Sequence, residues 1–342
     1  MKSTTALGAS APDSAAAGPV SRSSGSGPGF RRGPGAGSGR PSGRPSGRPS
    51  GRGIRRQLPL SPWLFAAPGL LIAGAFSLYP FLSTLVNSFT DRRALIPGRY
   101  VGLANFRELI HDEMFWIGLR NSTLYVVGVV PALVVLPLLL AMLVQRHIPG
   151  ITFFRAAFYT PVVASIVVVG LIWVWMLDDR GLINSVLETV GIGGIGFLSD
   201  QWLLLFSAMG VTVWKGLGYY MIIYLAALAN VPRELHEAAA VDGAGAVRRF
   251  VTVTVPAVRS TMVLVGALSS VAAFKVFSEV YLMAGPSGGP AGEDTTLVML
   301  VQRVGTGLTG RVGYASALSV VVFCVTVALM LLVLRADRKE DA

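Results

Sequence analysis

The sequence predicts an all-α integral membrane protein with six transmembrane helices. Of the 342 residues, 52% are hydrophobic and only 14% are charged, whereas soluble domains carry about 25% charged residues. Six apolar segments reach the roughly 20 residues that a helix needs to cross a bilayer, and four of them contain no charged residue. The six segments are residues 62–89, 121–144, 156–177, 202–229, 257–284 and 312–334.

The residues before the first apolar segment have a different composition. They are rich in Gly, Ser, Pro, Ala and Arg, and residues 1–60 hold ten basic residues and a single acid. Such a segment has too little apolar surface to fold. We expect a disordered basic tail over 1–57, a six-helix transmembrane domain over 58–336 and a short tail over 337–342. Because the first apolar stretch begins only near Pro62, no cleaved signal peptide is expected.

Composition also argues against several classes of function. Outside residues 1–60 the chain has 19 basic and 17 acidic residues, so we expect no nucleic-acid partner. One cysteine and three histidines offer no ligand cluster for a metal. Two glycine-rich G-x-G-x-x-G stretches, at 191–196 and 305–310, fall in predicted loops and lack the strand and helix of a nucleotide site. We therefore expect no catalytic residue, no metal ligand and no cofactor bound by this chain.

The basic residues of the loops predict the orientation in the membrane. With the N-terminus inside, the cytoplasmic flanks of the spans carry fourteen Lys and Arg residues and the outer flanks carry eight. Both termini and residues 231–256 are thus expected in the cytoplasm, and residues 178–200 outside. The outer loop 90–120 is expected to hold a short amphipathic helix.

The loop over residues 231–256 has its own helical pattern. Pro232 suits the first turn of a helix, and Glu234 and Glu237 lie where the positive end of the helix dipole favours carboxylates. Gly243 can end this helix. A second short helix from Ala246 would then lead to the fifth span. Taken alone, the pattern is typical of a helical hairpin at the membrane surface.

This loop resembles the one found in permeases of binding-protein-dependent ABC importers. Those permeases carry Glu-Ala-Ala, three residues, Gly, nine residues and Ile-x-Leu-Pro. Here Glu237-Ala238-Ala239 is followed by Gly243 and by Val-Thr-Val-Pro at 253–256, so every spacing is kept. The same loop implies a role for Asp242 and Pro256 in the coupling segment.

The resemblance extends over about residues 60–335, where the chain is similar to the maltose and glycerol-phosphate permeases of the carbohydrate-uptake branch. Two segments, 277–281 and 284–290, depart from that pattern, which weakens any inference about the particular solute. The matching residues are Trp214 with Gly218, the run 225–228, Trp173-Val-Trp175, Gly181-Leu-Ile-Asn184 and Gly313-Tyr314-Ala315.

The resemblance implies a type I importer fold and a set of partners. In that family the Glu-Ala-Ala loop is a coupling helix that docks on a cytoplasmic ATPase, so hydrolysis of ATP with Mg²⁺ takes place in a separate subunit and this chain is not an enzyme. The implied assembly has a second, homologous permease, two ATPase domains and an extracellular solute-binding protein. It lies among the lipids of the bacterial plasma (inner) membrane and imports a small-molecule solute, with a sugar or oligosaccharide as the best match.

Charged residues inside the predicted spans are candidates for the solute path. Lys275 and Glu279 are four residues apart and are expected on one helix face, turned to the protein interior, because a charge at mid-bilayer costs at least about 2.5–3.5 kcal/mol without a partner or water. They could form a structural ion pair, make an inter-subunit contact or line the solute path. Lys215 is a candidate of the same kind. It directly follows Trp214 and precedes Tyr219 and Tyr220 in the sequence.

A secondary transporter driven by an ion gradient is the alternative function. Such proteins use carboxylates within the membrane and often have two repeated halves with discontinuous helices. Glu279 is the only carboxylate well inside a predicted span, and no internal repeat is evident. This alternative also leaves the Glu-Ala-Ala loop unexplained.

Overall fold

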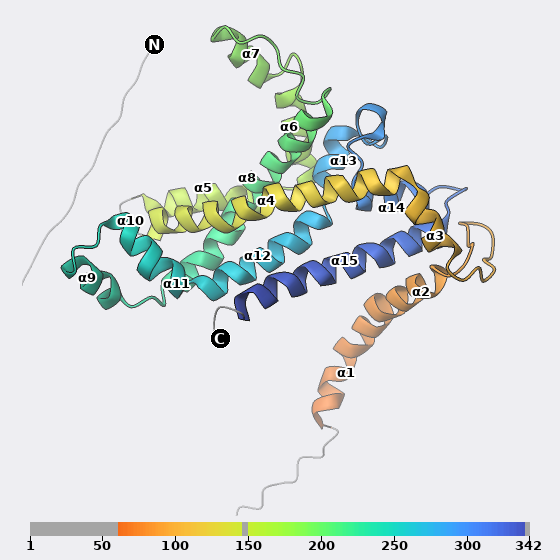
Figure 1. The fold of residues 1–342 in the computed structure, drawn as a ribbon, viewed down its shortest axis with the longest axis horizontal. Coiled ribbons are helices and arrows are strands. Elements are labelled where there is room, and N and C mark those ends of the chain that lie inside the picture. Colours follow the sequence, from red (N-terminus) through yellow and green to blue (C-terminus); the bar gives the residue numbers. More distant parts are fainter. Residues whose placement is uncertain (1–60, 146–149, 339–342) are drawn as a thin grey trace, which may run out of the picture. The chain divides into compact units, whose positions relative to one another are not determined.

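The computed structural model describes residues 61–145 and 150–338, and all of the regular structure in these two ranges is helical apart from one isolated bridge between Thr90 and Tyr100. The predicted tail 1–57 and residues 339–342 lie outside the described residues. Residues 337–338 continue the last helix instead of starting a separate tail. Figure 1 shows the order of the helices along the chain.

Four of the six predicted spans are long helical segments (Figure 1). Their limits agree with the sequence to within a few residues, except that the second span begins eight residues earlier than predicted, at Glu113. The four are α1 (Ser61–Ala73) with the π-turn η1 (Gly74–Leu78) and α2 (Tyr79–Asn87), then α4 (Glu113–Gln145), α8 (Gln201–Leu228) and α15 (Val312–Arg338).

The third predicted span, 156–177, is not one helix. It consists of α5 (Ile151–Val163) and α6 (Ile166–Leu177), and the chain bends by 99° between α5 and the helical segment after it. Ala164 and Ser165 are extended at the break, with ψ of 142° and 128°. The prediction of a continuous third helix is therefore wrong. Pro161 removes one backbone donor two residues before α5 ends.

The fifth span is also interrupted. The helix α12 (Arg259–Phe274) ends at Lys275, and α13 (Ser278–Ala284) begins after Phe277, whose φ of −138° and ψ of −61° are not helical. The helix axis therefore does not run through residues 275–277. This break changes how Lys275 and Glu279 are placed.

The remaining helices are short and lie between the spans. The predicted amphipathic helix of the first outer loop is present, as α3, although the last part of that loop belongs to α4. The loop 231–256 contains the two predicted helices, followed by a π-turn and the start of a three-residue helix. These elements are α3 (Ala104–His111), α7 (Leu182–Thr189), α9 (Arg233–Val241), α10 (Ala246–Arg249), η2 (Phe250–Thr254), α11 (Val255–Ala257), η3 (Pro290–Gly292) and α14 (Leu297–Gly305).

Each of the two π-turns in the described residues ends two residues before a proline. The Tyr79 N–H donates to the Gly74 carbonyl ahead of Pro80, and the Val255 N–H donates to the Phe250 carbonyl ahead of Pro256. A proline inside a helix cannot donate to the carbonyl four residues earlier, and its ring crowds that carbonyl. Widening the preceding turn relieves this conflict.

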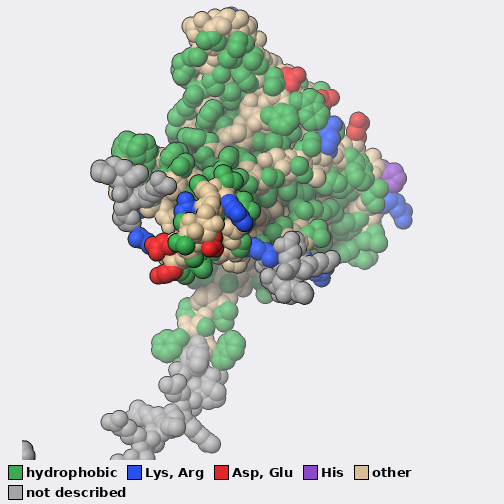
Figure 2. Space-filling view, turned by 60° about the vertical axis from the view of Figure 1, so that its left-hand side comes forward, with side chains coloured by type: hydrophobic (Ala, Val, Ile, Leu, Met, Phe, Trp, Pro, Cys, Tyr) green, Lys and Arg blue, Asp and Glu red, His purple; other side chains and the backbone are tan. Residues whose placement is uncertain are grey.

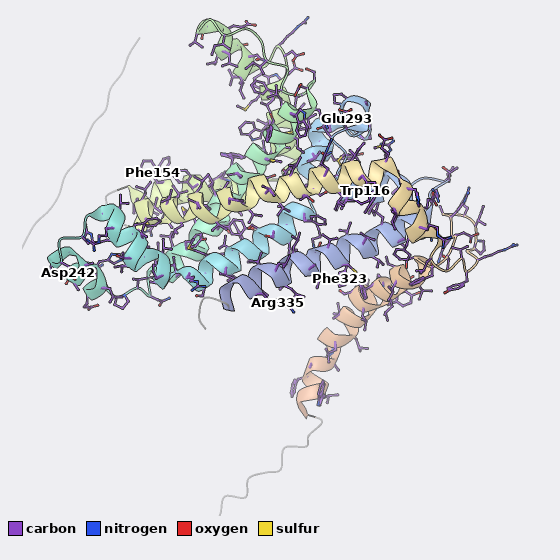
Figure 3. The ribbon with its side chains drawn as sticks, viewed as in Figure 1. Trp116, Phe154, Asp242, Glu293, Phe323 and Arg335 are labelled. Carbon is purple, nitrogen blue, oxygen red and sulfur yellow. The ribbon has the colours of Figure 1, made fainter. Side chains whose placement is uncertain are left out.

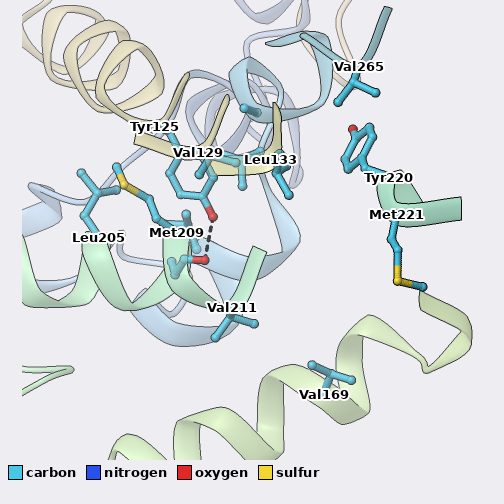
Figure 4. Close-up of a cluster of buried hydrophobic side chains, with 14 of the residues drawn as sticks. Tyr125, Val129, Leu133, Val169, Leu205, Met209, Val211, Tyr220, Met221 and Val265 are labelled. Atoms are coloured by element: carbon cyan, nitrogen blue, oxygen red, sulfur yellow. Dashed lines mark hydrogen bonds between the residues drawn. The ribbon is translucent and has the colours of Figure 1, made fainter. Parts of the chain in front are cut away.

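The core forms where α4 packs against α8 and α12, with α12 also packed against α15 (Figure 1). Two tyrosines join α4 to α8 by hydrogen bonds: Tyr125 donates to the Ala208 carbonyl over 2.9 Å, and Tyr224 donates to the Val134 carbonyl over 2.9 Å. Figure 4 shows Tyr125 among the buried side chains of this cluster, which include Val129, Leu205 and Met209.

The helices α5 and α8 approach closely at Gly218. A Cβ added to this glycine would lie 2.1 Å from the Phe158 carbonyl oxygen. Only a residue without a side chain allows the two backbones to meet there. In contrast, none of the most apolar window of the first span is buried within the chain.

Candidate coupling loop and membrane-embedded site

The helix α9 carries the Glu-Ala-Ala residues on an exposed segment. Glu237, Ala238 and Asp242 are exposed and Ala239 is half-buried, and no residue of α9 is buried. Three large apolar side chains of α9 and α10 are also open to solvent: Leu235 is 49% exposed, Val241 88% and Val247 77%. Exposed apolar side chains grouped on one short loop are typical of a surface that contacts another protein or a membrane.

Gly243 ends α9 in the way the sequence predicts. Its φ is +77°, and the Ala244 N–H donates to the Ala239 carbonyl over 2.9 Å while the Gly243 N–H donates to the Ala240 carbonyl over 3.1 Å. This pair of bonds is the Schellman motif, in which glycine supplies the left-handed residue. A Cβ at Gly243 would meet nothing within 4 Å, so the constraint on this residue is its backbone conformation and not lack of space.

The loop is connected to the membrane helices through α10 and η2. The N-terminal end of the second short helix is Ala246, as predicted, and Pro256 lies in the three-residue helix α11 just before the break at Val258. Thr254 is buried, whereas Pro256 is exposed. Figure 3 shows Asp242 at the α9 end of the molecule, whereas Glu293 lies beside α13, far from Asp242.

The structure separates the two charged residues of the fifth span. Lys275 caps α12 and is exposed, and Glu279 is half-buried in the first turn of α13. They do not share a helix face, because residues 275–277 leave the helical conformation. The expectation that both face the interior also fails for Lys275 within this chain.

Trp214 and its neighbours form an aromatic group on α8. Trp214 is 39% exposed and makes an edge contact with Trp173 of α6, with ring centroids 5.6 Å apart. Tyr219 is 48% exposed and Tyr220 is buried, and their ring centroids are 5.1 Å apart. Lys215 is half-buried. The structure thus brings Trp214 and Trp173 together and leaves Tyr220 packed in the core.

Three residues that match the wider family pattern hold loops in place. Asn184 donates to the carbonyls of Asp178 and Ile195 and accepts from the Ile195 N–H, which fixes the loop after α7. A Cβ at Gly181 would lie 2.4 Å from the Trp175 carbonyl, and one at Gly313 would lie 1.9 Å from the Thr90 carbonyl.

Sequence reasoning missed the segment 285–297, which closes the end of the helix bundle that lies away from the coupling loop. Asn121 of α4 donates to the carbonyls of Glu293 and Thr295 over 2.6 and 3.0 Å, and Ser122 accepts from the Leu297 N–H over 3.1 Å. Four glycines with positive φ, at 285, 288, 289 and 292, shape this turn. The glycine-rich run 284–290 was the available signal.

A second missed contact joins α3 to α15. Arg311 forms a bidentate ion pair with Glu108, with N–O distances of 2.6 and 2.7 Å, and its guanidinium lies 4.5 Å from the centroid of the Tyr314 ring. The pKa of Arg311 is raised further by the hydrogen bond to Glu108. Tyr314 also hydrogen-bonds Asp112.

Comparison with known proteins places these features in one family. The model of the binding-protein-dependent transport system inner membrane component matches residues 121–340. The chain is 30% identical over 293 residues to the lactose transport system permease protein LacF of Rhizobium radiobacter, covering 84% of this chain and 97% of LacF. It is 33% identical over 290 residues to the diacetylchitobiose uptake system permease protein NgcF of Streptomyces coelicolor, covering 80% and 81%.

The fold is also that of a solved importer. A crystal structure of a bacterial ABC transporter involved in the import of alginate matches with a TM-score of 0.71 at 22% identity, covering 81% of this chain and 96% of that one. At this identity the match concerns the fold alone. Together with the family match, the helices and the Glu-Ala-Ala loop, it leads to one conclusion: this chain belongs to the binding-protein-dependent transport system inner membrane components, as a multi-pass permease subunit of an ABC importer.

Proposed function

We propose that this permease forms the path of a sugar or oligosaccharide and that α9 transmits the movements of a separate cytoplasmic ATPase to it. The observation that carries the second part is the exposed loop: α9 buries none of its residues, yet Leu235, Val241 and Val247 present apolar surface. A docking groove on a partner would cover that surface. ATP and Mg²⁺ would be bound by the partner, with no cofactor held by this chain.

The proposed assembly contains a second permease, two ATPase domains and a solute-binding protein. One support is that an alginate transporter with this fold was solved in complex with its alginate pentasaccharide-bound periplasmic protein. Another is the first span, whose apolar window buries nothing within this chain and thus offers a face for a homologous permease or for lipid. With the positive-inside bias, both termini and α9 would lie in the cytoplasm.

The choice of a sugar rests on relatives and on aromatic side chains. Relatives of this chain are named for lactose, diacetylchitobiose and arabinooligosaccharides. Trp214, which is exposed, and Trp173, which is half-buried, provide an aromatic pair of the kind that lines binding sites for apolar faces of ligands. Lys215, Lys275 and Glu279 would supply polar contacts along the path.

The solute can be identified with the purified transporter in proteoliposomes. Binding protein loaded with each candidate solute is added, and ATP hydrolysis and uptake are measured. We expect stimulation by a neutral di- or oligosaccharide and a loss of uptake in Trp214→Ala, with Trp175→Ala, also exposed but outside the pair, as the control. Stimulation by amino acids or peptides only would contradict the sugar assignment. Uptake that stops when the proton gradient collapses at constant ATP would contradict the ATP-driven mechanism.

The coupling role of α9 predicts a specific pair of defects. Glu237→Lys reverses a charge on the exposed docking face, and Gly243→Asp forces a side chain into a φ of +77°. Both variants should insert normally, but ATPase subunits should be lost from the complex or should hydrolyse ATP without a response to loaded binding protein.

A matched control is available two residues further on. Gly245 has a φ of −66° and open space around its Cα, so Gly245→Asp adds the same charge without backbone strain and should retain coupled uptake. Normal ATPase recruitment and normal uptake in both Glu237→Lys and Gly243→Asp would rule out the coupling role.

A further inference from the structure

A cavity lies between the coupling loop and the ends of three membrane helices. Its volume is about 900 Å³, and its walls come from α4, α5, α8, α9, α10 and η2. Figure 2 shows the α9 end of the molecule turned forward, with charged side chains gathered on that face. The described lining residues are Met142, Gln145, Arg155, Leu225, Leu228, Ala229, Val231, Arg233, His236, Ala246, Arg249, Phe250 and Thr254.

The polar part of this lining is strongly basic. Arg155, Arg233 and Arg249 line the cavity together with His236, and among the described lining residues there is no carboxylate. The acidic residues of α9, Glu234 and Glu237, are exposed and do not belong to the lining. Arginines that converge without a local acid leave a positive potential that favours an anion.

Two polar groups at the cavity are buried without a partner. The Thr254 side chain is only 2% exposed, and its hydroxyl has no hydrogen-bond partner among the described residues. The Arg249 Nε is likewise enclosed and unpaired. Buried polar groups are nearly always satisfied in folded proteins, so an unpaired hydroxyl and an unpaired guanidinium nitrogen on two residues that line the same cavity indicate a missing acceptor. A ligand with several oxygens would supply it.

The arginines are also held from different elements. Arg155 of α5 donates through Nε and Nη2 to the Val144 carbonyl at the end of α4, over 3.1 and 2.6 Å, which fixes the guanidinium and leaves Nη1 free of that bond. Arg233 starts α9 and Arg249 ends α10. A ligand that bonds all three would connect the coupling loop to the membrane helices.

We propose that this cavity binds a phosphate group, carried either by an anionic phospholipid or by a small soluble phosphate ester. Guanidinium groups match phosphate oxygens with paired, charge-assisted hydrogen bonds, and the Thr254 hydroxyl adds a neutral donor. Basic pockets at the ends of membrane helices hold lipid headgroups in this way. The apolar wall of Met142, Leu225 and Leu228 suits the body that carries the phosphate.

The bound phosphate would stabilise the position of the coupling loop. It would bridge Arg233 and Arg249 on the loop to Arg155 on α5, so the loop would move with the membrane helices only while the site is filled. This role is independent of the transported solute. It concerns how firmly α9 is attached to the spans, whichever solute passes between them.

Two arms of one experiment distinguish the sources of phosphate. In the first, the whole transporter is placed in nanodiscs of equal parts phosphatidylcholine and phosphatidylglycerol, and native mass spectrometry counts the phosphatidylglycerol retained. In the second, nanodiscs of phosphatidylcholine alone are titrated with glucose 6-phosphate, with glucose as the uncharged control, after the ATPase sites have been filled with ADP and vanadate. Slower hydrogen exchange of amides 233–249 reports binding in both arms.

The variants separate this site from general charge effects. Arg233→Gln and Arg249→Gln should each weaken binding by roughly tenfold or more, the loss expected for one charge-assisted hydrogen bond. Arg248→Gln, which removes an equal charge from an exposed position on the same short helix outside the lining, should leave binding unchanged. Retained phosphatidylglycerol identifies a lipid, and saturable glucose 6-phosphate binding identifies a soluble ester.

Thr254→Val keeps the proposal testable if the arginine variants fail to assemble. Because the hydroxyl has no partner within the described chain, its removal should not destabilise the fold, yet it should weaken phosphate binding by about three- to tenfold. The proposal is overturned if neither probe binds, if Arg248→Gln weakens binding as much as Arg249→Gln, or if Thr254→Val binds as well as the parent protein.

Discussion

Asp294 is a fully enclosed carboxylate in the loop that closes the bundle against Asn121. Its side chain is 0% exposed, and neither oxygen has a hydrogen-bond partner among the described residues. Gly289 approaches so closely that a Cβ there would lie 2.2 Å from Oδ2. Burial, together with the charges of Glu293 and Asp200, raises the pKa of Asp294 to about 7, and Arg120 opposes this shift only weakly.

The raised pKa predicts how stability depends on pH. A carboxyl group whose pKa is higher in the folded state than in the unfolded state holds a proton that unfolding releases, so the free energy of unfolding falls as pH rises from about 4 to about 7. The slope contributed by one group is at most about 1.4 kcal/mol per pH unit.

Asp294→Asn should therefore raise the thermal unfolding midpoint at pH 8 and change it little at pH 4.5, since the parent carboxyl is protonated there. Glu293→Gln, one residue away and exposed, serves as the control and should keep most of the parent's pH dependence. Equal midpoints for Asp294→Asn and the parent at pH 8 would show that Asp294 is not buried in this way.

At the scale of single residues, the sequence predicts that Gly243 ends a helix, whereas the family pattern marks Gly218 and Asn184 without showing why they are needed. The reasons for Gly218 and Asn184 appear only in three dimensions: Gly218 lies against the backbone of Phe158, and Asn184 makes two hydrogen bonds with Ile195 and one with Asp178. Asp294 gave no sequence signal, because a lone aspartate in a glycine-rich loop is normally solvated. Its burial depends on contacts with residues far away in the chain.

The contact between α5 and α8 gives a test at the scale of helices. In Gly218→Ala the added Cβ would lie 2.1 Å from the Phe158 carbonyl oxygen, and the helices would have to separate at a cost of about 1–3 kcal/mol. Gly210→Ala on the same helix meets nothing within 4 Å and should be neutral or slightly stabilising.

The melting temperature of each purified variant in detergent measures this difference. Gly218→Ala should melt several degrees lower than Gly210→Ala, and the amides of α5 should exchange faster in Gly218→Ala alone. Indistinguishable melting of the two variants would show that α5 does not pack on α8 through this glycine.

Helix limits were predictable where hydropathy alone decides them. The fourth and sixth spans match the sequence prediction closely, since an apolar run ends at polar residues on both sides. The break at 164–165 was not predictable because the run stays apolar on both sides of it. The break at 275–277 was not predictable because the four-residue spacing of Lys275 and Glu279 also fits an uninterrupted helix. Proline does not mark such breaks reliably either: α4 continues through Pro131 and Pro137, while α5 ends two residues after Pro161.

At the scale of the whole molecule, the bias in basic residues predicts an orientation in the membrane that can be measured. Single cysteines at Ser199 and Val247, both exposed, are introduced into a Cys324→Ala background, since Cys324 is itself exposed. In whole cells an impermeant thiol reagent should label position 199 only. In inside-out vesicles the reagent should label position 247. These vesicles are prepared without ATPase subunits, because bound subunits would cover α9.

Labelling of position 247 from outside the cell, with position 199 protected, would show that the orientation is the reverse of the predicted one. The same measurement in a chain lacking residues 1–57 tests whether the basic tail, which lies outside the described residues, helps to set the orientation.

The global fold class was predictable because the bilayer restricts spanning segments to a few lengths and compositions. The packing of the spans was not, because it depends on which helix faces meet.

The break between α5 and α6 has a consequence for hydration. The last carbonyls of α5 and the first amides of α6 lack the helical partners that a continuous span would provide, and Ala164 and Ser165 are half-buried and exposed within this chain. Hydrocarbon cannot solvate such backbone groups. If the break lies at membrane depth, residues 164–165 must therefore face water or polar protein instead of lipid.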